Sequence, residues 1–164
     1  MLSNGKDNNL SYNVKKGGNT VLVEAPISMT IDQTEICCGI SVLSSDTYKT
    51  DATYPIRGSH SLAIDKSNGL LLRLKNRQLN TDFTLEARSY NDGIAFRMIL
   101  PGNKNQVRIP DEHTVFTLPA KSQVWYHDMY CHYEGIHQKK NISEIVKGEW
   151  AAPPITVQLP DNGG

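Results

Sequence analysis

The strongest constraint on the fold is a regular alternation of apolar and polar side chains across residues 81–100. The alternation holds over 81–90, is interrupted by Asn91-Asp92-Gly93, and resumes over 94–100. A period of two residues is that of a half-buried β-strand, whose successive side chains point to opposite faces. Asparagine, aspartate and glycine tolerate the positive φ of a tight turn. The segment therefore predicts a β-hairpin with one apolar face and one polar face.

Other stretches also favour strands. Residues 70–75 place Leu70, Leu72 and Leu74 on one face of a further strand. Helical periodicity is nearly absent, and its best candidate is the short stretch 141–147. The remaining predicted strands are 20–24, 27–31, 106–109, 114–118, 123–126 and 155–159.

These patterns together indicate an all-β chain. Many short strands, frequent turn residues and 12 glycines predict an antiparallel β-sandwich with at most one short helix. A length of 164 residues suits one domain with a sizeable core. Because no internal repeat or low-complexity linker divides the chain, we predict a single domain over residues 1–164.

Charge and hydropathy narrow the possible functions. The chain has 17 basic and 17 acidic residues, so its formal net charge is zero. Nucleic-acid affinity rests largely on a basic surface, and we therefore expect no nucleic-acid partner. No stretch approaches the ~20 apolar residues of a membrane-spanning helix, so we expect no membrane partner. The first residues also lack the basic and apolar regions of a signal peptide.

The three cysteines, Cys37, Cys38 and Cys131, do not suggest a disulfide framework. Adjacent cysteines rarely pair with each other, and an odd count leaves one thiol over. Their spacing also lacks the paired elements of a zinc site. We expect free and mostly buried thiols.

Potential ligands and aromatic side chains concentrate between Trp125 and His137. The histidines of this stretch are five residues apart, a spacing that aligns them neither on a strand nor on a helix, which disfavours zinc. Calcium takes six to eight oxygen ligands. Glu134 suits that ion, and Asp128 is a weaker second candidate.

Each of these residues also has a plainer interpretation. By residue type alone Glu134 is typical of an ordinary surface carboxylate. The aromatic residues either stack on sugar rings or pack in a core or an interface. The aromatic residues in question are Trp125, Tyr126, Tyr130, Tyr133 and, further on, Trp150.

Four segments together resemble the front part of glycoside hydrolase family 97. The most specific are TLEARSYNDGIAFRMILPG at 84–102 and VWYHDMYCHYEGIHQKKNISEI at 124–145. Weaker similarity lies in DATYPIRG at 51–58 and ITVQLPDNGG at 155–164. The chain thus resembles this family from residue 51 onward.

The resemblance implies a fold and a larger parent protein. Family members are α-glucosidases and α-galactosidases, usually periplasmic or secreted. They have an N-terminal β-supersandwich of the galactose-mutarotase type, a catalytic (β/α)8 barrel and a small C-terminal β domain. The resemblance therefore implies that this chain is a truncated N-terminal domain. Because the barrel and its catalytic carboxylates are absent, we expect the chain alone to be inactive.

The resemblance also assigns residues. In this family an active-site calcium ion is held by barrel glutamates and one glutamate of the N-terminal domain, which corresponds to Glu134. Tyr133, His132 and Trp125 are weaker candidates for contact with the sugar. One carboxylate cannot hold calcium alone, so we expect tight calcium binding only in the parent enzyme. The expected partners are the barrel, a carbohydrate substrate, and possible second copies joined through an exposed interface or the edge strand at 155–159.

Two alternatives belong to other functional classes. A free-standing carbohydrate-binding β-sandwich module would need an exposed aromatic platform and affinity for sugar without the barrel. An unrelated β-sandwich interaction domain would pack residues 126–137 as ordinary core. The choices between glucosidase and galactosidase, and between retention and inversion, are set by barrel residues outside this sequence.

Overall fold

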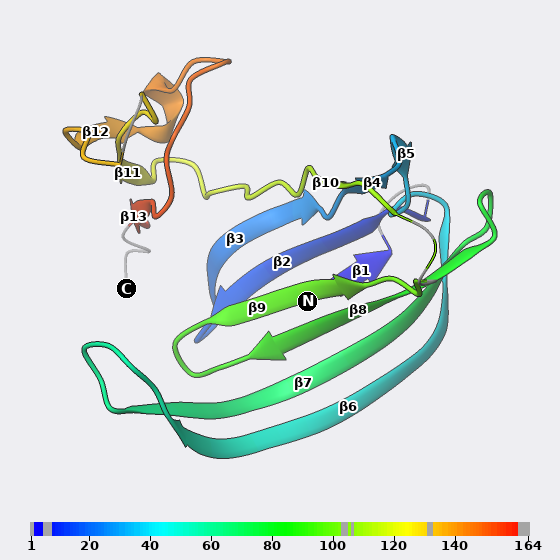
Figure 1. The fold of residues 1–164 in the computed structure, drawn as a ribbon. Helices are drawn as coiled ribbons and strands as arrows, with labels where there is room; N and C mark the ends of the chain where they lie inside the picture. Colours follow the sequence, from blue (N-terminus) through cyan, green and yellow to red (C-terminus); the bar gives the residue numbers. More distant parts are fainter. Residues whose placement is uncertain (1, 5–7, 103–104, 106, 131–132, 161–164) are drawn as a thin grey trace. The chain divides into compact units, whose positions relative to one another are not determined.

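The computed structural model describes residues 2–4, 8–102, 105, 107–130 and 133–160. Almost all of its regular structure is β-strand, arranged in several antiparallel sheets, which confirms the predicted all-β class (Figure 1). No helix within these described ranges is long and apolar enough to cross a membrane.

The chain separates into two compact units by its internal contacts. We call residues 28–113 with 4 and 8–10 the hairpin unit, and residues 114–160 with 2–3 and 11–27 the C-terminal unit. Each is described by itself below.

A four-stranded antiparallel sheet dominates the hairpin unit (Figure 1). Its strands follow the chain in order, with β6 Ile40–Pro55, β7 Leu62–Asn76, β8 Thr81–Ser89 and β9 Ile94–Ile99. The register pairs Ser89 with Ile94 across the predicted turn, so the hairpin expected at 81–100 is confirmed. The strand expected at 70–75 forms the second half of β7.

The sheet has one apolar face, as the alternation predicts. Leu74, Phe83 and Leu85 lie on that face and are almost wholly buried. Burying one such side chain stabilises a fold by roughly 1.5–3 kcal/mol. This face is therefore the core of the hairpin unit.

The opposite face carries a buried carboxylate. Glu86 is only 5% exposed and accepts a hydrogen bond from the hydroxyl of Tyr48. Arg97 Nε donates to the same carboxylate at 2.6 Å, and Arg88 Nε donates at 3.2 Å. Arg88 also binds Asp65 at 3.0 Å through Nη1. This Glu86 cluster joins side chains from all four strands.

Tyr48 lies directly over a glycine of the neighbouring strand. Tyr48 and Gly69 are paired in register, and a Cβ added at residue 69 would lie 2.1 Å from the ring of Tyr48. The absence of a side chain at this position lets the ring lie flat and bring its hydroxyl to Glu86.

A second, small sheet in the hairpin unit has the order β10-β4-β5, with β10 Pro110–Glu112, β4 Met29–Ile31 and β5 Thr34–Glu35. Asp32 and Gln33 connect β4 to β5, both with positive φ, as a tight hairpin turn of mirror-image type requires. Asp32 also accepts a hydrogen bond from Arg108 Nε at 2.8 Å.

The C-terminal unit contains most of a sheet with the order β1-β2-β3, formed by β1 Leu2–Asn4, β2 Leu10–Lys16 and β3 Asn19–Pro26. The turn between β2 and β3 is Gly17-Gly18, where both φ angles are positive. A further sheet has the order β12-β11-β13, with β11 Gln123–Tyr126, β12 Gln138–Asn141 and β13 Thr156–Gln158.

Three predicted elements are wrong in whole or in part. Described residues 107–109 form no strand, whereas Gln106 lies outside the described residues. Residues 114–118 hold only one isolated bridge, between Val23 and Thr117. The stretch 141–147 forms only the three-residue 3-10 turn η2 Ile142–Glu144. Asn141 ends a strand there and Ile145 is extended, so too few residues remain to offset the cost of helix nucleation.

The other predicted strands agree with strands of the structure, in full or in part. The strand expected at 123–126 matches β11, and 20–24 falls inside β3. The strands expected at 27–31 and 155–159 are shorter, as β4 and β13. The turn residues 161–164 lie outside the described residues.

The contact between Tyr48 and Gly69 gives a stability prediction. We expect Gly69→Ala to lower the free energy of unfolding by about 1–3 kcal/mol, because the methyl group forces the tyrosine ring away. Urea denaturation measures the change. Gly93→Ala is the matched control, since its Cβ would meet no atom within 4 Å. Equal stability of the two variants would contradict the packing described for Tyr48.

Candidate functional site

The predicted site residues lie on β11 and on the segment that joins it to β12. Trp125 is in the middle of β11 and half-buried. It pairs in register with Lys139 of β12, whose Nζ lies 4.8 Å from the centre of the indole ring. The cation lies over the indole ring and stabilises this pair of strands.

Tyr126 belongs to the core, which confirms the plainer interpretation for this residue. Its side chain is 1% exposed, and its hydroxyl donates a hydrogen bond to Glu149. Lys140 Nζ donates to the same carboxylate oxygen. These two donors lower the pKa of Glu149 to about 2, with Lys140 the larger cause. The group ties the chain near residue 149 to β11 and β12.

His127, which follows β11 directly, is also buried. Its ring lies 4.9 Å from that of His137 and 6.3 Å from that of Tyr133, both edge to face. A Cβ added to Gly135 would lie 2.7 Å from Nδ1 of His127. His127 therefore serves as the base on which the described residues 133–137 pack.

Glu134 lies on that segment, and its side chain is exposed. Tyr133 beside it is 60% exposed, and Asp128 is exposed as well. His132 and Cys131 lie outside the described residues. The structure thus brings Tyr133 and Glu134 together on one exposed segment, while Trp125 lies on β11 beside Lys139.

The side chains near Glu134 can be compared with the ligands that a calcium ion requires. Across the described ranges, no three or more His, Cys, Asp or Glu side chains gather where they could hold a metal ion. Glu134 offers carboxylate oxygens at the surface, the donor type that calcium prefers. The residues fit calcium as one contributed ligand and not as a complete site.

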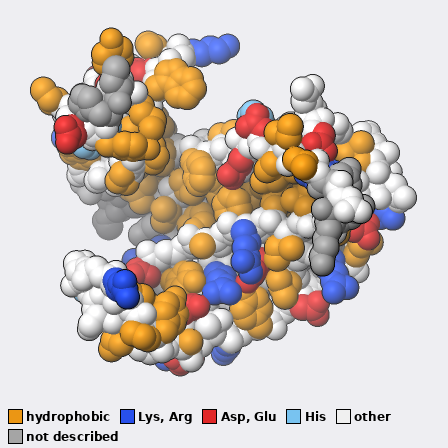
Figure 2. All heavy atoms as spheres, in the orientation of Figure 1, with side chains coloured by type: hydrophobic (Ala, Val, Ile, Leu, Met, Phe, Trp, Pro, Cys, Tyr) orange, Lys and Arg blue, Asp and Glu red, His pale blue; other side chains and the backbone are white. Residues whose placement is uncertain are grey.

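The C-terminal unit also carries large apolar side chains that are exposed. In the C-terminal unit Ile136 is 94% exposed, Tyr130 80% and Trp150 78%. Figure 2 shows hydrophobic side chains gathered at the surface of this part of the chain. Such a concentration on a folded unit is typical of an interface.

The structural roles of Glu149 and Gly135 could not be predicted from the sequence. By residue type Glu149 is typical of a solvated surface charge, and its sequence gives no sign of the partner Lys140, which lies on a strand nine residues earlier. Gly135 carries no local signal either, because the contact that requires it is with His127. The alternation on β11 does indicate which residues are core, since Val124 and Tyr126 share one face and are both buried.

The expectation of free and mostly buried thiols holds for Cys37, whereas Cys38 is free but exposed. Burial, followed by the charge of Glu35, raises the pKa of the Cys37 thiol to about 12. Cys37 thus holds its proton and is not a nucleophile. Cys131 lies outside the described residues.

Comparison with known sequences identifies the family. The whole chain, residues 1–164, matches the family described as Glycosyl-hydrolase 97 N-terminal. The chain belongs to this family. The resemblance stated from the sequence is therefore confirmed.

Relatives place this family 97 domain within longer proteins. It is 32% identical over 113 residues to the retaining alpha-galactosidase of Bacteroides thetaiotaomicron, a match covering 68% of this chain and 16% of that protein. A crystal structure of a beta-arabinopyranosidase has a TM-score of 0.69 and 21% identity, over 78% of this chain and 21% of that one. At that identity the structural match supports the fold alone. The chain spans only a small part of either relative's length.

The group around Glu149 predicts a pH dependence. A carboxylate whose folded-state pKa is depressed contributes stability that is present above its ordinary pKa of 4.5 and lost as the pH falls toward about 2. We expect the C-terminal unit to lose stability across this range. Both tryptophans, Trp125 and Trp150, lie in this unit, so tryptophan fluorescence during urea unfolding reports on it.

The matched control is Glu149→Gln, which keeps the shape of the side chain and removes its titration. This variant should be less stable at neutral pH and lose less stability between pH 4.5 and 2. The same loss in both proteins would show that other carboxylates govern the acid transition.

Proposed function

We propose that this chain is the N-terminal, non-catalytic domain of a family 97 α-glycosidase, where it packs on a (β/α)8 barrel and supplies Glu134 to an active-site calcium ion. The observation that carries the proposal is the family match over all 164 residues. The relative with a stated activity, a retaining alpha-galactosidase, supports α-galactosides or the related α-glucosides as substrates.

The exposed position of Glu134 supports its assigned role. The side chain of Glu134 lies on the surface, where a carboxylate can reach a metal ion shared with a partner. Calcium, when bound, would supply a Lewis acid beside the glycosidic oxygen. The chain's part is to hold one carboxylate in place through the packing of Gly135 on His127.

The apolar surface supports docking on a barrel. Ile136 stands two residues from Glu134 and is the most exposed large apolar side chain of the chain's described residues. An interface that covers Ile136 and Trp150 would remove both from water and would bring Glu134 to the partner's surface. The same contact would thus bury Ile136 and Trp150 and complete the calcium site.

The calcium role is tested in the full polypeptide that carries this domain. We expect Glu134→Gln to weaken calcium binding at least about tenfold, since affinity follows the number of charged ligands. Isothermal calorimetry measures the affinity directly. Glu112→Gln, which changes another exposed carboxylate in β10, should leave it unchanged.

The chain alone provides the complementary measurement. It should bind calcium more weakly than ~10 µM and should hydrolyse neither aryl α-galactoside nor aryl α-glucoside. Turnover by the chain alone that is abolished by Glu134→Gln would overturn the proposal, because the active site would then lie within these residues.

The docking surface makes a separate prediction. The isolated chain should self-associate, because Ile136 and Trp150 expose apolar area to water. The double substitution Ile136→Ser, Trp150→Ser should reduce association while changing the free energy of unfolding by about 0.5 kcal/mol or less. Sedimentation equilibrium measures the association.

The control for self-association is Val107→Ser in the hairpin unit, where the valine is 88% exposed. It removes a comparable apolar side chain from a different part of the chain. If Val107→Ser reduces association as much as the double variant does, Ile136 and Trp150 do not form the interface.

A further inference from the structure

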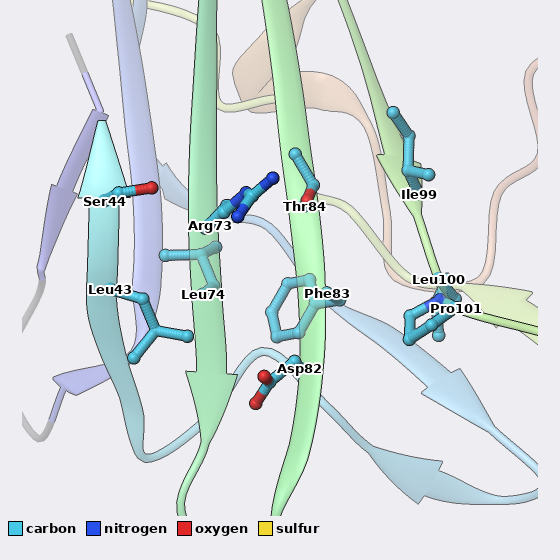
Figure 3. Close-up of a pocket in the computed structure, with 10 residues that line it drawn as sticks. All are labelled: Leu43, Ser44, Arg73, Leu74, Asp82, Phe83, Thr84, Ile99, Leu100 and Pro101. Carbon is cyan, nitrogen blue, oxygen red and sulfur yellow. The ribbon is translucent and has the colours of Figure 1, made fainter. Parts of the chain in front are cut away.

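The polar face of the four-stranded sheet contains two hollows. One, of about 280 Å³, is lined by Arg88, Tyr90 and Arg97 beside the buried Glu86. The other, of about 470 Å³, is lined by residues that include Arg73, Thr84 and Ile99. Figure 3 shows these last three on the neighbouring strands β7, β8 and β9. Both hollows lie wholly within the hairpin unit.

The two hollows follow one another along β8 and β9. Arg97 pairs with Glu86, and Ile99 pairs with Thr84. Residues two apart on a strand share a face, so these pairs are neighbouring rungs of the same polar surface. From Ala95 to Ile99 the strand advances about 13 Å, which suits a short oligosaccharide better than a single sugar ring.

The donor at the centre of this surface is held in place before any ligand arrives. Arg97 donates from Nε to the buried Glu86 at 2.6 Å, yet its side chain remains 68% exposed. Its terminal amino groups therefore reach solvent in an orientation that Glu86 fixes. A donor fixed in this way loses little conformational entropy when a ligand binds.

The charges of this face balance one another. Lys75 pairs with Asp82 and Arg97 with Glu86 across neighbouring strands, and the face has no excess of positive charge to attract a phosphate or sulfate. Sugar hydroxyls both donate and accept hydrogen bonds and fit such a mixed surface. The polar face carries four basic and four acidic side chains, namely Arg73, Lys75, Arg88 and Arg97 with Asp46, Asp65, Asp82 and Glu86.

Apolar side chains complete the larger hollow. Leu43 and Ile99 are 52% and 42% exposed, and both line it together with Pro101. A pyranose ring has an apolar face of C–H groups beside its hydroxyls. Apolar walls with a few placed polar groups are the usual composition of a small-molecule site.

We propose that this face of the sheet is a secondary binding site for a neutral oligosaccharide, lined by Arg73, Thr84 and Arg97. The choice of carbohydrate as ligand class rests on the proposed function, but the residues belong to the hairpin unit and not to the segment of Glu134. The site would hold a polysaccharide chain near the enzyme without taking part in hydrolysis.

The test uses the chain itself with maltotriose and raffinose as probes. We expect both sugars to shift amide NMR signals of β8 and β9 in a saturable titration. Arg73→Ala should weaken binding about tenfold, since a hydrogen bond from a charged donor is lost. Arg77→Ala, which removes the same charge from an exposed residue outside both hollows, should bind like the unchanged protein.

The results that would overturn this site differ from those that would overturn the calcium role of Glu134. Absence of shifts, shifts confined to residues 125–137, or equal effects of Arg73→Ala and Arg77→Ala would each overturn the site. Displacement of the sugars by inorganic sulfate would overturn its neutral character. Glu134→Gln should leave the titration unchanged, so loss of the calcium role in the parent enzyme and loss of this site are independent results.

Discussion

The hairpin unit depends on one buried carboxylate. Placing the charge of Glu86 out of water costs several kcal/mol unless it is paired and hydrogen-bonded, and donors from Tyr48, Arg88 and Arg97 meet that requirement. They come from β6, β8 and β9, while β7 contributes the glycine over which Tyr48 lies. All four strands must therefore occupy their observed positions for the Glu86 carboxylate to receive its hydrogen bonds.

The two faces of this sheet specify its register together. A slip of one residue in β8 would turn Leu85 toward the polar face and Glu86 into the apolar core. Either change alone would destabilise the sheet, and a one-residue slip would make both changes together. This explains why the alternation over 81–100 predicted the hairpin correctly from the sequence.

The features that sequence reasoning missed rest on contacts between distant residues. The length of β6 and β7 was not predicted, because residues 40–69 are mostly polar on both sides and show no alternation. The stretch at 114–118 has β-branched residues but is held by a single bridge to Val23. At the candidate site the sequence indicated the right segment, but the burial of Tyr126 and His127 depends on Glu149 and Gly135, which local patterns do not reveal.

Two of the chain's carboxylates hold its strands together. Glu86 and Glu149 lie among donors of their own unit, and those donors hold the pKa of each below its ordinary value. Such groups stabilise strands and have little capacity left for a ligand. Glu134 is on the surface, on a segment that packs on the buried His127. The proposed shared metal site would require a carboxylate that is in place when the partner surface arrives, and the packing of this segment on His127 supports that requirement.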